Sequence, residues 1–104
     1  MIRVNVLYPY REGARFDADY YAKTHMGMVR EAFGTHGLVS ITVERGLVGG
    51  QPKSPPLYAG IGRLDFETME GYKSAFREHG ERLMADVPNF TDIQPLVQVS
   101  EVVL

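Results

Sequence analysis

The sequence predicts an α+β fold of the ferredoxin-like type, in which a four-stranded antiparallel sheet carries two helices on one face. Segments with strand-like alternation and segments with helical periodicity follow one another in the order βαββαβ along the 104 residues. Right-handed crossovers and hairpin pairing allow few arrangements of this order, and the ferredoxin-like one is favoured. No repeat or linker divides the chain, so residues 1–104 are expected to form a single domain.

Four segments have the alternation of apolar and polar residues that is typical of strands. They cover residues 2–8, 39–43, 57–66 and 96–104. One face of the predicted sheet is apolar and is expected to pack against the helices: Ile2, Val4, Val6, Val39, Ile41, Val43, Val97, Val99 and Val103. The opposite face is mixed, because apolar residues there lie among polar ones: Leu7, Leu38, Leu96, Val102 and Leu104. An exposed apolar patch of this kind marks an interface, so the sequence predicts a homodimer joined through this second face.

The first predicted helix covers residues 18–33. Asp17 is a suitable N-cap, and Phe16 can pack against Tyr21 as a hydrophobic staple. Gly34 follows the last apolar residue and is typical of a helix end.

The second predicted helix begins after Thr68, another suitable N-cap. Its apolar residues share one face: Met69, Tyr72, Phe76, Leu83 and Val87. Gly80 weakens the helix and allows a break there. In the loop that follows, Phe90 is unusually apolar, which fits either a plug beneath the helix or the wall of a pocket. In the second case, Asn89 or Thr91 would orient a ligand.

The composition excludes several classes of function. The chain has no cysteine, so a disulfide, a cysteine metal site and a thiolate nucleophile are all excluded. The net charge is −2 and the charges are mixed, so no basic patch for nucleic acid is expected. Apolar runs are far shorter than the ~20 residues of a membrane span, and the N-terminus lacks the pattern of a signal peptide. We therefore expect a cytoplasmic protein that binds neither nucleic acid nor membrane.

His25 lies near the centre of the apolar face of the first helix, at ~100° per residue. It is expected to point toward the sheet. Small residues on both surfaces would leave room for a pocket: Ala18, Ala22 and Ala32 on the helix, and Gly60 and Gly62 on the third strand. An imidazole can exchange protons near neutral pH, and Tyr21 one turn earlier could share a ligand with it. The alternative is a buried histidine that only bonds a neighbour, and spacing alone leaves both interpretations open.

The two other histidines have weaker patterns. His36 is expected at the surface, and His79 is expected to be structural. No two histidines stand four residues apart, and no carboxylate stands at metal-ligand spacing from any of them, so no metal site is expected. The sequence has no motif for a nucleotide or other cofactor, and none is expected.

Two motifs and one further segment resemble the EthD family. The motifs are the helix pattern Y-x-x-x-H-M at residues 21–26 and ADVPNFTD at residues 85–92, and between them Phe66 is followed by ETMEGYKSAF. The similarity covers the chain from Val4 to about Val103. It implies a dimeric α+β barrel, in which the sheets of two ferredoxin-like halves pack face to face with the helices outside. The founding member is encoded beside genes for ethyl tert-butyl ether degradation.

The resemblance also implies functional residues. Several relatives with this barrel use a histidine and tyrosines in the cavity between helices and sheet, and these relatives include cofactor-free monooxygenases, lactone isomerases and cyclases. By position, the histidine is His25 and the helix tyrosine is Tyr21. In an enzyme His25 would be the general acid/base, with Tyr21 and Tyr8 or Tyr58 orienting the substrate. The loop residues of the family fall on Asp86, Pro88, Asn89, Phe90 and Thr91. The family commonly has proline where this chain has Gly27.

Three roles remain open from the sequence. The first is a small cofactor-free enzyme that acts on a hydrophobic carbonyl or phenolic compound. The second is a non-catalytic protein that binds a hydrophobic small molecule or assists a degradation or oxygenase pathway. The third is a structural role for His25, in which protein side chains fill the cavity.

Overall fold

The computed structural model describes all 104 residues and has the predicted order of elements. One antiparallel sheet has the strand order β2-β3-β1-β4, which is that of the ferredoxin-like fold. Its strands are β1 (Ile2–Pro9), β2 (Leu38–Arg45), β3 (Tyr58–Phe66) and β4 (Leu96–Glu101). The helices are α1 (Ala18–Tyr20), η1 (Tyr21–His25), α2 (Met26–Phe33) and α3 (Met69–Asp86), with short 3₁₀ turns η2 (Gly34–His36) and η3 (Val87–Asn89).

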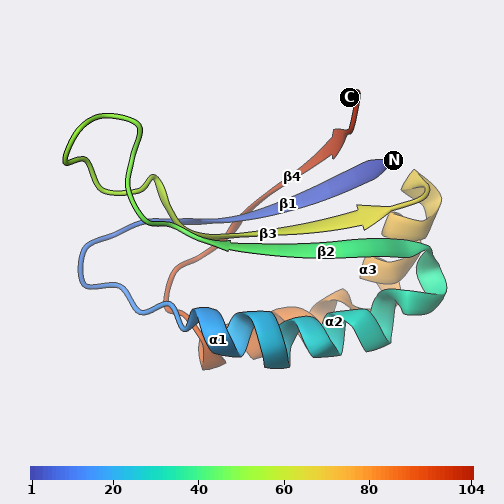
Figure 1. The fold of residues 1–104 in the computed structure, drawn as a ribbon. Helices are drawn as coiled ribbons and strands as arrows, with labels where there is room; N and C mark the ends of the chain where they lie inside the picture. The colour runs from blue at the N-terminus through green and yellow to red at the C-terminus, as the bar shows by residue number, and fades with distance from the viewer.

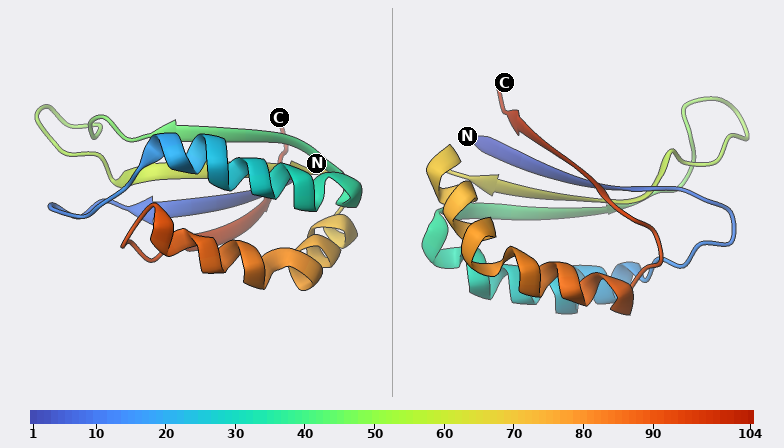
Figure 2. Two further views of the ribbon diagram at one scale, coloured as in Figure 1. Left: turned by 90° about the horizontal axis from the view of Figure 1, so that it is seen from below. Right: turned by 180° about the vertical axis from the view of Figure 1, so that it is seen from behind.

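The molecule has two layers. All helices lie on one face of the sheet, and the other face is uncovered (Figures 1 and 2). The segment between β2 and β3 projects beyond the end of the sheet (Figure 1). No helix is both long enough and apolar enough to cross a membrane.

The core between the two layers is rich in aromatic side chains. Tyr8, Tyr21, Phe33, Phe66 and Phe90 are all almost completely buried. The rings of Tyr21 and Phe90 stack with centroids 4.8 Å apart. The predicted staple is confirmed, because the ring of Phe16 packs against Tyr21 at 5.5 Å.

A bulge in β2 changes one predicted face of the sheet. Leu38 pairs with Phe66, and the register shifts by one residue before Ser40, so Val39 is the extra residue. Because an extra residue reverses the alternation, Leu38 packs on the core and Val39 is 50% exposed. The predicted places of Val39 on the core face and of Leu38 on the opposite face were therefore wrong.

The first helical segment contains a turn of π-helix, η1. Its i→i+5 hydrogen bonds add a residue to the turn and rotate the residues that follow around the helix axis. Met26 is consequently buried, whereas Ala22 is exposed and does not share the apolar face predicted from a regular helix. His25 lies in this turn and is buried.

Two other element boundaries differ from the prediction. The strand β4 ends at Glu101, and Val103 beyond it is 85% exposed and does not contribute to the core. The helix α3 continues through Gly80 without a break. It begins after Thr68, whose side chain accepts a hydrogen bond from the backbone N–H of Gly71, as expected for an N-cap.

Candidate functional site

His25 and Asp86 form a buried pair that joins the two long helical segments. Nδ1 of His25 lies 2.9 Å from Oδ2 of Asp86, and the residues are 6% and 9% exposed. His25 belongs to η1 and Asp86 is the last residue of α3. The imidazole thus bonds to the second helix and not to the sheet.

Asp86 receives two further hydrogen bonds. Tyr20 Oη and Asn89 Nδ2 each donate to Oδ1 at 2.8 Å. Burial on its own would raise the pKa of Asp86, but the hydrogen bonds from His25, Asn89 and Tyr20 outweigh it and hold the pKa below its usual value. The hydrogen bond to this carboxylate also raises the pKa of Tyr20. Asp86 is therefore an ionised carboxylate that only accepts hydrogen bonds.

This arrangement defines the tautomer of His25. Because a carboxylate can only accept, Nδ1 of His25 carries the proton that is shared with Asp86. The lone pair of a neutral ring then lies on Nε2. No side chain or backbone group of the protein bonds to Nε2, and it is not sealed from solvent. The pair therefore presents a free basic nitrogen, held in one orientation by Asp86.

The ring of His25 lines a small apolar cavity between the helices and the sheet. The cavity has a volume of about 50 Å³, and 12 of its 14 lining residues are hydrophobic. Two of these, Met84 and Val97, are about half exposed, so the mouth of the cavity lies between α3 and the edge strand β4. Ligand pockets commonly measure about 300–1,000 Å³, so a ligand requires lining side chains to move.

The space that the sequence predicted above the third strand is filled by aromatic side chains. A Cβ atom on Gly62 would overlap the Tyr21 hydroxyl and lie 2.9 Å from Cε of Met26. A Cβ atom on Gly60 would overlap the ring of Phe16. The two glycines thus admit rings that belong to the core, which corrects the expectation that they leave a pocket open.

Tyr8 and Tyr21 place neutral phenols beside His25. Burial raises the pKa of Tyr8 to about 12. Burial raises the pKa of Tyr21 further, and the neighbouring Tyr8 adds to this effect. The ring of Tyr21 lies 5.6 Å from that of His25 and 5.3 Å from that of Tyr8. Both phenols line the cavity and remain protonated hydrogen-bond donors over the range in which proteins work.

The loop residues Asn89, Phe90 and Thr91 pack beside the His25–Asp86 pair or hold the loop in place. Phe90 is fully buried, and its ring packs on that of His25 at 4.9 Å, as predicted for an apolar plug. The hydroxyl of Thr91 donates to the backbone carbonyl of Arg15 and accepts from the backbone N–H of Ile93. The Thr91 hydroxyl therefore holds the loop, and Asn89 holds Asp86.

Tyr58 lies apart from the other predicted residues. It is half-buried at the start of β3 and lines a separate surface depression with Val48 and Pro56. It is not among the residues that line the His25 cavity.

The sequence did not predict Asp86 as the partner of His25, and it did not predict a role for Tyr20. One feature of the sequence did indicate that Asp86 needs hydrogen-bond donors. A carboxylate in the last turn of a helix is opposed by the helix dipole, so Asp86 needed donors from elsewhere. Nothing in the local sequence identifies Tyr20 and His25 as those donors.

The family-model comparison agrees with the resemblance noted above. The model described as EthD domain matches residues 14–94, which contain both helical segments and the loop up to Gln94. The chain belongs to the EthD family. A comparison with curated proteins finds no significant match.

Solved structures of EthD proteins resemble the chain along its whole length. It is 42% identical to an EthD-like protein from Ralstonia eutropha, with a TM-score of 0.94 over 99% of this chain and 92% of that one. An ethyl tert-butyl ether degradation (EthD) family protein from Bacillus halodurans is 20% identical, with a TM-score of 0.72 over 98% of each chain. A cofactor-independent oxygenase from Streptomyces nogalater shares the fold at 11% identity and a TM-score of 0.57, over 99% of this chain and 92% of that one.

Proposed function

We propose that this EthD protein is a small cofactor-free enzyme that removes a proton from a hydrophobic carbonyl or phenolic compound. Nε2 of His25 is the general base, and Asp86 positions it. The observation that carries the proposal is the buried His25–Asp86 pair, which leaves Nε2 free at the wall of an apolar cavity. A well-placed general base contributes about 10²–10⁴-fold to a rate.

The proposed step moves one proton. The Nε2 lone pair forms an N–H bond while the substrate's O–H bond, or the C–H bond next to its carbonyl, breaks. The electron pair stays on the substrate as a phenolate or an enolate. Asp86 stabilises the imidazolium that results. Tyr8 and Tyr21 are the candidate donors to the substrate oxygen, since both phenols line the cavity in their protonated form.

The same anion can lead to three outcomes. Return of the proton at another carbon is an isomerisation, and attack on an internal carbonyl is a cyclisation. Electron transfer to O₂ begins an oxygenation, which is the type of reaction named for the Streptomyces nogalater oxygenase of the same fold. All three begin with a positioned base in a dry cavity, and the oxygenation needs O₂ as its oxidant in addition.

A second candidate function is a non-catalytic protein that binds an apolar molecule in the same cavity. The observation that favours it is the lining, which is hydrophobic at 12 of 14 positions. Binding would then require no proton transfer, and His25 would serve only as a hydrogen-bonding group.

We also propose that two chains pair through the uncovered face of the sheet. Leu7 and Leu96 lie opposite each other on neighbouring strands, and Leu96 is 55% exposed. Two pairs of opposite charges on this face are already joined within the chain, Arg3 with Asp65 and Arg63 with Glu44. Arg3 donates to both carboxylate oxygens of Asp65 at 2.8 and 3.0 Å, and this holds the pKa of Asp65 below its usual value. Internal pairing lowers the cost of removing these charges from water, which supports burial of this face in a homodimer.

Native mass spectrometry of the purified protein, beside the same protein denatured, tests the proposal first. The expected result is a dimer that carries a small organic molecule, whose chemistry then defines the assay. ¹³C-methyl NMR of the five methionines shows where that molecule binds. Met26 and Met84 line the cavity and their signals should shift, whereas Met69 does not line it and serves as the internal control.

The outcomes separate the candidates. Turnover of the bound compound that depends on His25 supports the enzyme. Shifts at Met26 and Met84 without any turnover support the binding protein. No shift at either methionine with any co-purified or added apolar compound would leave His25 with a structural role.

A further inference from the structure

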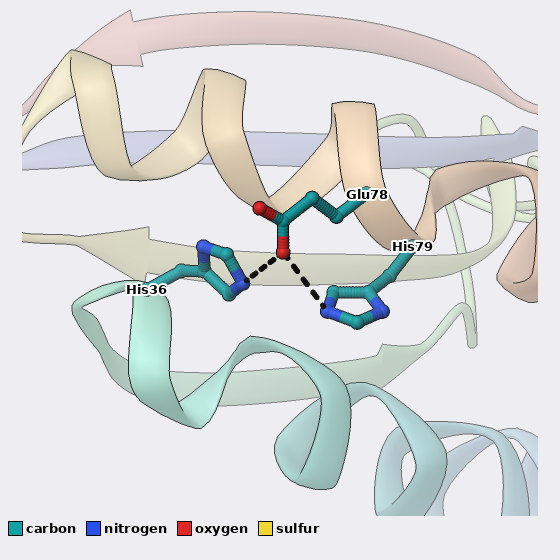
Figure 3. A group of neighbouring side chains, drawn as sticks. All are labelled: His36, Glu78 and His79. Carbon is teal, nitrogen blue, oxygen red and sulfur yellow. Dashed lines mark ion pairs between the residues drawn. The ribbon is translucent and has the colours of Figure 1, made fainter.

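Three side chains from two elements meet near Phe33, a residue that also lines the cavity. His36 comes from η2, and Glu78 and His79 come from α3. Oε2 of Glu78 lies 3.2 Å from Nε2 of His36 and 3.7 Å from Nε2 of His79. Each residue brings one ligand atom to within 4.8 Å of the others, and Figure 3 shows the carboxylate between the two imidazole rings. The side chain of His36 is only 12% exposed, so its predicted place at the surface was wrong.

The ring of His36 is held in the orientation that metal-binding histidines usually have. Its Nδ1 lies 3.0 Å from the hydroxyl of Ser74, while Nε2 faces Glu78. Metal-ligating histidines generally use the second ring nitrogen for such a hydrogen bond, which defines the tautomer and the orientation of the ring.

The backbone that carries these residues is closely packed. A Cβ atom on Gly71 would overlap the backbone carbonyl of His36, so the first turn of α3 rests directly on η2. Gly37, with φ of 85°, ends η2 in the left-handed region that glycine adopts without strain. The ring of His79 also packs edge-on against that of His36, with centroids 5.3 Å apart. The three ligand atoms are therefore positioned by the scaffold and not by flexible loops.

Either a proton or a metal ion can join these groups. A carboxylate only accepts, so each imidazole Nε2 meets Glu78 either as an N–H donor or as a lone pair beside a shared metal ion. Two imidazole nitrogens and one carboxylate oxygen form a donor set that suits zinc and its neighbours among the divalent transition metals. Around a tetrahedral Zn²⁺ with bonds of about 2.0–2.1 Å, ligand atoms lie roughly 3.3 Å apart, which is close to the separations from Glu78.

We propose that His36, Glu78 and His79 form a binding site for a divalent transition metal ion, with Zn²⁺ as its expected occupant. The side chain of Glu78 is 54% exposed, so water can take the fourth position. The ion would fasten the end of the first helical segment to α3. The site is independent of the His25 chemistry proposed above, because it shares no ligand with the cavity.

Calorimetric titration of the metal-free, full-length protein with Zn²⁺ alone tests the site, together with thermal unfolding at increasing Zn²⁺ concentration. We expect one Zn²⁺ per chain and a Tm that rises with the free ion, as for any ligand that binds only the folded state. Ser74→Ala should weaken binding about 10–100-fold, which is the usual effect of removing an outer hydrogen bond of a ligand. His36→Gln and His79→Gln should each weaken it more than Ser74→Ala does.

Glu78→Gln should also weaken Zn²⁺ binding more than Ser74→Ala does, and Glu81→Gln is its matched control. Glu81 lies on the same helix, is exposed and has no ion pair, so its variant should bind Zn²⁺ like the wild type. Should His36→Gln fail to fold, His79→Gln provides the same test, since the side chain of His79 is 30% exposed. The proposal is overturned if Zn²⁺ does not bind saturably, in which case the cluster is an ordinary ion pair. It is also overturned if Zn²⁺ binds equally well to His36→Gln, His79→Gln and the wild type.

Discussion

Nδ1 of His25 lies 2.9 Å from Oδ2 of Asp86, and the two residues are separated by most of the chain. This contact joins the π turn η1 to the C-terminus of α3 and holds the ring of His25, which lines an apolar cavity. We expect the contact to contribute both to the stability of the fold and to the proposed proton transfer. Unfolding experiments measure the first contribution, and kinetic assays measure the second.

Asp86→Asn should destabilise the protein in a manner that depends on pH. The pKa of Asp86 is lowered from its usual value in the folded protein, so folding favours the ionised group. Its contribution is fully present above the pKa of the unfolded chain and is lost as the pH falls through the folded-state pKa. We expect a loss of about 1–3 kcal/mol in the free energy of unfolding at neutral pH, because the buried donors lose a charged acceptor.

Urea unfolding of the wild type and Asp86→Asn between about pH 3 and pH 7 checks this. The difference between the two proteins should shrink below about pH 4, where the carboxyl group of the unfolded wild-type chain takes up a proton while Asp86 in the folded protein is still ionised. A difference that stays constant over the whole range would show that the charge of Asp86 contributes nothing to stability.

His25→Gln should abolish proton transfer while the chain stays folded. Glutamine fills much of the same space and can still donate to Asp86, but its amide cannot act as a base. Once the native ligand supplies an assay, we expect kcat to fall by about 10²–10⁴-fold. Circular dichroism should confirm the fold, and Glu81→Gln on the outer surface of α3 should have wild-type activity. Wild-type turnover by His25→Gln would remove this residue from the mechanism.

Gly62→Ala and Gly27→Ala should have opposite effects on stability. At Gly62 the new methyl group would overlap the buried Tyr21 hydroxyl, and overpacking of this kind costs about 1–3 kcal/mol. At Gly27 it would meet nothing within 4 Å in a helix, where alanine is favoured over glycine by about 0.5–1 kcal/mol. Denaturant midpoints measure both changes.

The double variant Gly62→Ala with Tyr21→Phe tests the cause of the first effect. Removing the hydroxyl should recover part of the stability lost in Gly62→Ala. If Tyr21→Phe makes the loss larger, the new methyl group does not clash with the hydroxyl. Gly62 would then not be the residue that leaves space for the Tyr21 hydroxyl beside β3.

Leu7→Lys should convert a dimer into a monomer. Leu7 pairs with Leu96 on the uncovered face of the sheet, and a charge buried there without a partner would oppose association. Sedimentation velocity at micromolar concentration measures the effect. Met69→Lys introduces the same side chain on the helical layer and should leave the dimer intact. A monomeric wild type would contradict the proposed interface, and so would a dimeric Leu7→Lys.

Signals close together in the sequence predicted most of the fold. Alternation over residues 2–8 predicted a strand. The N-caps Asp17 and Thr68 predicted where the two helices begin, because capping and periodicity act over a few residues. The bulge at Val39 and the π turn were not predicted. Each adds one residue to an otherwise regular element, and the alternation or periodicity on either side of it has no mark of the extra residue.

The candidate site residues show the same difference between features that depend on nearby residues and features that depend on distant ones. By itself the sequence determined that His25 and Tyr21 lie on a buried helix face, because burial follows from periodicity and hydrophobicity, whereas it left Phe90 open between a plug and the wall of a pocket. Only the tertiary structure decided that His25 meets Asp86, that Tyr58 lies elsewhere, and that His36 joins Glu78 and His79. Those contacts depend on how two helices pack on one sheet, and a hydrogen bond between distant residues leaves no period or spacing in the chain.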